Sequence, residues 1–99
     1  MRRFFQETAV AKAVVDPNEL RRFAAELKRF NATLQTEIVN IHRQFKRLGE
    51  TWQDQEHAKF AEDFDRMVNA LNRFVEASDK QVPSLMRKAE AAQNYLDQR

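Results

Sequence analysis

Two long rows of apolar residues at helical spacing dominate the pattern of the chain. Members of each row are three or four positions apart, so each row lies along one side of a helix. The first row consists of Leu20, Phe23, Leu27, Phe30, Leu34, Ile38, Ile41, Phe45 and Leu48. The second row consists of Phe60, Phe64, Met67, Leu71, Phe74, Ser78, Val82, Leu85, Ala89, Ala92 and Leu96. The sequence therefore predicts two amphipathic helices, over about residues 17–48 and 52–97.

Residues that commonly cap helices mark the start of the first one. The carboxylate of Asp16 can accept a hydrogen bond from a free backbone N–H, and Pro17 has its φ angle preset for the first helical position. Glu19 lies where a capping box has its acid. These signals place the start of the helix at Pro17.

A turn over residues 49–52 is predicted to separate the two helices. Gly49, the only glycine, directly follows the first apolar row, where many helices end on a left-handed residue. Thr51 is expected to be the N-cap of the second helix, with Asp54 as the acid of its capping box. Trp52 can cover this end of the molecule. Because the turn is short, the two helices must lie antiparallel.

Pro83 falls inside the second helix, where it removes one backbone hydrogen bond and crowds the preceding turn. It must therefore kink or break the helix. A kink is favoured because the apolar row resumes in phase at Leu85. The first helix would be about 48 Å long and the second about 69 Å. The part of the second helix after about Lys88 should therefore extend beyond the first.

The composition supports an all-α fold of one domain. The 99 residues include one Gly and two Pro, too few for the turns of a β-sandwich, and strong helix formers are abundant. The absence of cysteine excludes disulfides and thiolate metal sites. The sequence contains no run of 18 apolar residues that could span a membrane.

Residues 1–15 show no helical period, and we predict that they form a flexible N-terminal arm. Phe4 and Phe5 are its possible docking residues, the alternative being a disordered terminus. The basic and aromatic start is similar to that of a signal peptide. However, polar residues between Gln6 and Lys12 interrupt the apolar stretch that such a signal needs, so we expect no cleaved leader.

Charge is distributed unevenly, although the net charge is only +2. Up to Gly49 there are ten basic and five acidic residues, and from Glu50 onward there are seven basic and ten acidic ones. A basic first half and an acidic second half attract each other when folded antiparallel. The small net charge of +2 is a poor basis for binding phosphates, so we expect no nucleic-acid partner.

Two helices by themselves leave apolar side chains uncovered, which predicts a second chain. A further row of the second helix is the predicted surface for that partner: Ala61, Val68, Val75, Val82 and Met86. Small or branched residues flank the row of the first helix: Ala24, Ala25, Ala32 and Val39. Because exposed apolar area costs free energy in water, we expect dimerisation into a four-helix bundle. The partner can be a second copy or a related helical hairpin.

The sequence contains no arrangement typical of an active site or a cofactor site. His42 and His57 are far apart and have no matching partner one helical turn away. Asp54, Glu56 and His57 cluster, but a tight metal site needs three or four convergent ligands, and the two acids have roles at the helix start. No catalytic triad pattern, phosphate-binding loop or DNA-recognition signature is present. We therefore expect no enzyme activity and no cofactor.

The region around the turn resembles a known family. The residues that carry the resemblance are Leu48-Gly49-Glu50-Thr51-Trp52-Gln53-Asp54, then Phe60, Phe64, Leu85, Ala89, Ala92 and Tyr95-Leu96. They are similar to the WXG (Trp-x-Gly) family of ESAT-like proteins, over about residue 15 to the C-terminus. The resemblance implies a helical hairpin that pairs into a homo- or heterodimeric bundle. It also implies export in folded form, without a cleaved leader, by a type VII secretion system.

Two positions depart from the family pattern. Asp54 occupies the glycine position of the motif, giving Trp-x-Asp. In the family, a C-terminal secretion tail has an acid four residues after a tyrosine, whereas Tyr95 is followed by an acid at Asp97 and by Arg99 at the fourth position. Either a partner carries the export signal, or the chain stays in the cytoplasm as an adaptor. The resemblance further implies that Trp52 contributes to a recognition surface with a partner's C-terminal helix, the alternative being plain packing at the turn.

The sequence thus leaves three hypotheses for the function of the chain. The leading hypothesis is a secreted substrate or adaptor that binds other proteins, including a secretion ATPase or another secreted protein. The alternative is an intracellular scaffolding hairpin that is not exported. A third class, binding to nucleic acid or an anionic surface, would use basic residues that do not gather on one recognition helix: Arg2, Arg3, Arg21, Arg22, Arg43, Lys46 and Arg47.

Overall fold

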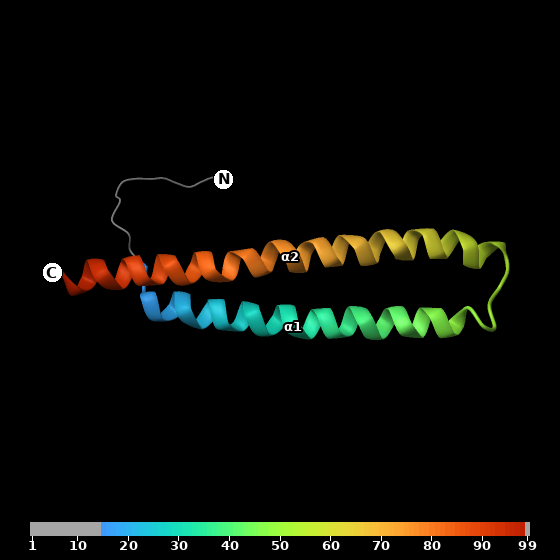
Figure 1. The fold of residues 1–99 in the computed structure, drawn as a ribbon, viewed down its shortest axis with the longest axis horizontal. Helices are drawn as coiled ribbons and strands as arrows, with labels where there is room; N and C mark the ends of the chain where they lie inside the picture. The colour runs from blue at the N-terminus through green and yellow to red at the C-terminus, as the bar shows by residue number, and fades with distance from the viewer. Residues whose placement is uncertain (1–14, 99) are drawn as a thin grey trace.

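The computed structural model describes residues 15–98, which form two long antiparallel helices joined by a short turn (Figure 1). Helix α1 spans Pro17–Leu48 and helix α2 spans Gln55–Asp97. The described part measures 67 × 26 × 14 Å, so it is only one helix thick in its shortest direction. The predicted all-α hairpin is confirmed. Of the predicted arm, residues 1–14 lie outside the described residues.

The start of α1 is capped at Asp16. One carboxylate oxygen of Asp16 accepts a hydrogen bond from the backbone N–H of Asn18, at 2.9 Å, and Pro17 occupies the first helical position. Glu19 does not close a capping box; its carboxylate forms an ion pair with Arg22, one turn further along α1. The N-terminal end of α1, which lies near the C-terminal end of α2, is therefore fixed by one capping residue, Asp16.

The turn is two residues longer than predicted, because Asp54 and not Thr51 is the N-cap of α2. Asp54 accepts a hydrogen bond from the backbone N–H of His57, at 3.0 Å, and the helix begins at Gln55. The hydroxyl of Thr51 donates to the carbonyl of Leu48 at the end of α1. Both residues are capable N-caps, but the Thr51 side chain is engaged at the end of α1, so Asp54 starts the second helix.

Gly49 also differs from the prediction. Its φ of −63° and ψ of −15° are right-handed, so no left-handed residue ends α1. A Cβ atom at this position would lie 3.3 Å from the carbonyl oxygen of Lys46 and 3.5 Å from Nε2 of His57. The contact with the His57 ring would be ordinary, whereas the contact with the Lys46 carbonyl oxygen would be tight, so a side chain here would need a small shift of the end of α1.

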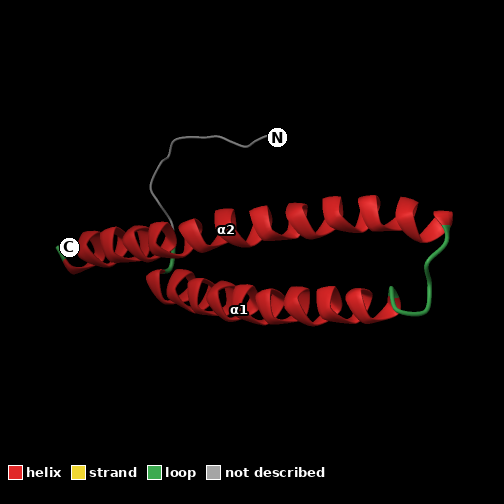
Figure 2. Ribbon diagram, turned by 45° about the vertical axis from the view of Figure 1, so that its right-hand side comes forward, coloured by secondary structure: helices red, strands yellow, loops and turns green. Residues whose placement is uncertain are grey.

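Helix α2 runs without a break through Pro83 (Figure 2), which excludes the broken helix. Pro83 is exposed, so the carbonyl group of Asp79, which loses its helical partner to the proline, can be hydrated. The kink remains a prediction. As expected, α2 continues past the start of α1 at the open end of the hairpin (Figure 1).

The helices meet along a seam that recurs every three or four residues on each of them. Buried residues of α1 are Pro17, Ala24, Asn31 and Ile38. Buried residues of α2 are Phe64, Val75, Ser78 and Ala89. Many of these side chains are small, so the two backbones can come close together, and the half-buried residues between them complete the same stripe.

The free energy of unfolding should be sensitive to side-chain volume where the two helices of the seam are closest. Ala89 is completely buried, so Ala89→Leu should lower the free energy of unfolding by about 1–3 kcal/mol through overpacking. Ala91, two residues further on, is exposed, and Ala91→Leu should change the free energy of unfolding by less than about 0.5 kcal/mol. Urea unfolding followed by circular dichroism measures both. Equal effects of the two substitutions would contradict the assigned seam.

Candidate interaction surfaces

One flank of the hairpin carries large apolar side chains from both helices. Phe23 and Phe30 of α1 each directly precede a buried seam residue, and Phe74 of α2 directly precedes buried Val75. Their exposed fractions are 57%, 52% and 48%. The rings of Phe30 and Phe74 meet edge to face with centroids 6.4 Å apart, so the two helices present these residues on the same side.

The apolar flank extends along α2 at heptad spacing. Phe60 and Met67 precede Phe74 by two heptads and one heptad, and they are 40% and 49% exposed. We call this set the apolar flank: Phe23, Phe30, Phe60, Met67 and Phe74. Contiguous exposed residues of this size are typical of a surface that another protein covers.

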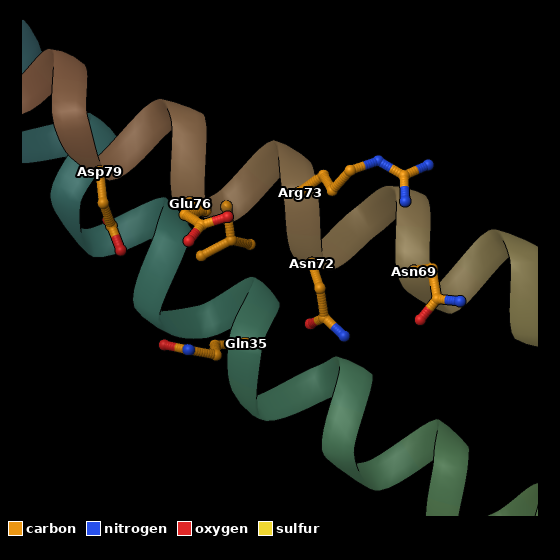
Figure 3. Close-up of a pocket in the computed structure, with 7 residues that line it drawn as sticks. Gln35, Asn69, Asn72, Arg73, Glu76 and Asp79 are labelled. Atoms are coloured by element: carbon orange, nitrogen blue, oxygen red, sulfur yellow. The ribbon is translucent and has the colours of Figure 1, made fainter.

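The opposite flank is polar. Figure 3 shows a shallow groove between the helices, with Gln35 from α1 facing amide and charged side chains from α2. The lining residues are Gln35, Asn69, Asn72, Arg73, Val75, Glu76 and Asp79. Behind them, the side-chain N–H of Asn31 donates a hydrogen bond to Asp79 at 2.9 Å. The hairpin therefore has two unlike flanks: large apolar side chains predominate on one, whereas on the other exposed Val39 lies among polar side chains such as Gln35.

This arrangement corrects the predicted partner surface. Val75 is 3% exposed, and Ala61, Val68 and Val82 are half-buried in the stripe that meets α1; only Met86, 43% exposed, is open to solvent. The two candidate rows of α2 are neighbours on the helix, so spacing alone could not decide which faces α1. The buried seam lies between the two rows: Phe64, Ser78 and Ala89 belong to the row that begins at Phe60, and Val75 belongs to the row that begins at Ala61. Bulky Phe60, Met67 and Phe74 lie at the edge of this seam.

A cluster of aromatic rings fills the turn end. Phe45 of α1 stacks on the imidazole of His57, with centroids 5.2 Å apart and an interplanar angle of 6°. Phe45 also contacts Phe64 at 4.5 Å and Phe60 at 5.6 Å. Trp52 closes the cluster by meeting His57 edge to face at 5.1 Å and Phe60 at 6.1 Å.

Trp52 thus links the turn to the apolar flank. Its side chain is half-buried, with His57 on one side and exposed Phe60 on the other. Both proposed roles of Trp52 are compatible with this position, because one part of the indole packs in the turn and another remains accessible.

Both histidines belong to aromatic packing. The ring of His57 packs against Phe45 and Trp52. Its Nε2 atom is buried and has no hydrogen-bond partner in the part of the chain that the structure describes. The ring of His42 stacks on Phe64 with centroids 6.3 Å apart. Within residues 15–98, no three His, Cys, Asp or Glu side chains converge as a metal site would require.

The final turns of α2 contain the residues of the possible secretion tail. Tyr95 is 55% exposed. The carboxylate of Asp97 accepts a hydrogen bond from the side chain of Gln93, at 3.0 Å, which is an ordinary contact along one helix face. Tyr95 and Asp97 therefore lie on regular helix.

The sequence pattern placed Ala24 only on the flank of the first row and did not single out Asn31, although each of these seam residues is only 1% exposed. Alanine and asparagine carry no hydrophobic signal comparable to the neighbouring Phe23 and Phe30. The signal that could have found them is position, because both fall on the heptad that leads from Pro17 to Ile38.

Neither described helix is long and apolar enough to cross a membrane.

Comparison with known proteins points to one family. The model of the WXG100 family, described as proteins of 100 residues with WXG, matches residues 13–98. No curated protein sequence matches the chain. Several crystal structures of the secreted protein EsxB from Bacillus anthracis str. Sterne are similar to it. One mutant form has a TM-score of 0.73 and 24% identity over 87% of this chain and 97% of EsxB. The wild type has a TM-score of 0.68 and 24% identity over 85% and 97% of the two chains.

The capping role of Asp54 accounts for its place in a motif that elsewhere has glycine. Its φ of −96° and ψ of −173° are extended backbone, which any residue adopts, so glycine is not needed here. Asp54→Ala should therefore lower the free energy of unfolding by about 0.5–2 kcal/mol, and Asp54→Gly by only a few tenths. Urea unfolding of both variants tests this. A larger loss for glycine than for alanine would show that capping is not the role of this residue.

Proposed function

The chain belongs to the WXG100 family, and we propose that it is a non-enzymatic protein-interaction module that pairs with another helical hairpin and takes part in type VII secretion. Three observations support the proposal: the family match over residues 13–98, the two-helix hairpin, and the one-sided exposure of apolar residues. The apolar flank carries most of the argument.

The exposure of this flank is costly unless another chain covers it. Burial of apolar area contributes about 25 cal/mol per Å², and aromatic side chains contribute the largest areas. The partner we propose is a second hairpin laid against the apolar flank. That arrangement turns two thin hairpins into a four-helix bundle with a shared core, while the polar grooves remain in water. The partner is either a second copy of the chain or a related helical hairpin.

The proposed role in export rests on the family and on the tail. EsxB is a secreted protein, and we propose the same destination for this chain, by itself or with its partner. Exposed Tyr95 and nearby Asp97 would be the tail residues that a secretion ATPase contacts. Trp52, at the opposite end of α2, would contribute to the surface formed with a partner chain.

Association should depend on the apolar flank and not on the polar groove. Phe74→Asp puts a charge among apolar residues in the proposed bundle, so the bundle should dissociate while the helical content of the hairpin is kept. Asn72→Asp puts the same charge in the polar groove and should leave association unchanged. Sedimentation equilibrium, with circular dichroism as a check on folding, distinguishes the two.

A wild-type chain that stays monomeric at high concentration, and remains so when mixed with hairpins of the same genome, would rule out the proposed pairing. Dissociation by Asn72→Asp alone would place the interface on the polar flank instead.

Export should be visible as the distribution of the protein between medium and cytoplasm. In cells with the type VII ATPase we expect the chain in the medium, and in cells without that ATPase we expect it to be retained. Retention in both would support the alternative, an intracellular scaffolding hairpin. The measurement should be repeated with Tyr95→Ala, for which we expect reduced export with unchanged intracellular dimer mass.

A further inference from the structure

A second heptad pattern runs along the outer side of α2, on the side of this helix that faces away from Asn72 and the polar groove (Figure 3). One row of the pattern consists of Phe60, Met67, Phe74, Gln81 and Lys88, and the other of Glu56, Asp63, Ala70, Ala77 and Ser84. Members of the two rows are three and four positions apart, so together they form one stripe, as the a and d positions of a coiled coil do. We call this stripe the outer seam. Except for half-buried Ser84, all of its residues are exposed in the hairpin.

Bulky and small side chains alternate along the centre of the outer seam. Met67 and Phe74 belong to one row, and Ala70 and Ala77 belong to the other. Two copies of α2 packed in parallel would bring each row against itself, with Phe74 against Phe74. Two antiparallel copies bring each row against the other row, so that a bulky side chain meets a small one. The outer seam is therefore complementary in shape to a reversed copy of itself.

One register of the antiparallel pair fits best, with its two-fold axis at the level of residue 72. It places Phe74 against Ala70, Met67 against Ala77 and Phe60 against Ser84. A shift by one heptad in one direction would place Phe74 against the carboxylate of Asp63. A shift in the other direction would place Gln81 against Ala70 in the apolar centre. Each shift brings a polar group against an apolar one, which costs free energy on desolvation.

The charged and polar positions of the outer seam match in the same register. Lys88 faces Glu56, and Gln81 faces Asp63, at both ends of the apolar centre. Within one hairpin, the carboxylate of Glu56 lies 3.7 Å from Nζ of Lys59, in an ion pair whose side chains are about three-quarters exposed. It is therefore accessible to a second cation. Because a two-fold interface contains each contact twice, this charge match occurs at both ends of the pair.

We propose that the partner which covers the apolar flank is a second copy of this chain, bound antiparallel through the outer seam of α2. The proposal rests on the pairing of hairpins proposed above and adds its partner, its contact and its register. The outer seam lies on a different side of α2 from buried Val75 and Ala89, so pairing leaves the contact with α1 intact. In this register Tyr95 lies beyond Gln55, the first residue of the other copy's α2, and it stays accessible.

Filling one of the small positions tests the contact. Ala77→Leu removes the space that Met67 of the second copy occupies, so the dissociation constant of the dimer should rise at least about tenfold. Ala91→Leu is the matched control. It makes the same change in the same row, but at a position that faces no residue of the second copy's α2, and it should leave the dissociation constant unchanged. Sedimentation equilibrium measures both, with circular dichroism to confirm that each exposed substitution leaves the hairpin folded.

Charge reversal tests the register. Lys88→Glu brings two carboxylates together at each end of the pair and should weaken self-association about tenfold at low salt. Adding Glu56→Lys to the same chain restores opposite charges and should recover most of the loss. Adding Asp63→Lys instead should not, although it introduces the same charge one heptad away.

Three outcomes would overturn the proposal. Equal effects of Ala77→Leu and Ala91→Leu would exclude the outer seam as the contact. Rescue by Asp63→Lys rather than by Glu56→Lys would exclude the register. A chain that stays monomeric by itself, yet pairs through Phe74 with a different hairpin, would exclude the second copy and leave the proposed function standing. Loss of export alone would affect only the proposed function, since the dimer is measured on the purified chain.

Discussion

The close approach of two helices through small side chains is the interaction on which the rest of this molecule depends. Ala24 of α1 and Ala89 of α2 are almost fully buried, and no third helix within residues 15–98 adds a layer. Each helix can therefore cover one stripe only. Larger side chains at these positions would separate the backbones, so Phe23, Phe30 and Phe74 lie at the edge of the seam and not inside it.

This arrangement of side chains around the seam gives the molecule two unlike flanks. Phe30 and Phe74 meet on one of them, and Gln35 and Asn72 line the other. The residues that hold the two helices together and the residues of the proposed partner surface are therefore different parts of the same helices. In a chain of one thin layer, this separation allows the proposed partner surface to be strongly apolar without being buried in the contact between α1 and α2.

Asn31 is the polar exception inside the seam. It is 1% exposed, and its amide N–H bonds to Asp79, while its carbonyl oxygen has no hydrogen-bond partner among residues 15–98. An unpaired buried acceptor lowers stability. A polar residue at such a position also penalises any register in which it would lose its partner, and the bond to Asp79 forms only when the helices are aligned as observed.

The sequence by itself determined the helical class, the extent of the first helix, the approximate extent of the second, the antiparallel hairpin and the family resemblance. Spacing of three and four residues and the caps around Asp16 and Asp54 are local signals, and local signals fix elements and turns. Even there the choice between Thr51 and Asp54 required the structure, because both are capable N-caps and only the geometry of the turn selects one. What only the tertiary structure decided was which residues of the two adjacent rows of α2 face α1. Val75 and Phe74 are both apolar and adjacent, so periodicity cannot separate them; the close approach of the two helix backbones does, because it puts Val75 inside the seam and leaves Phe74 at its edge.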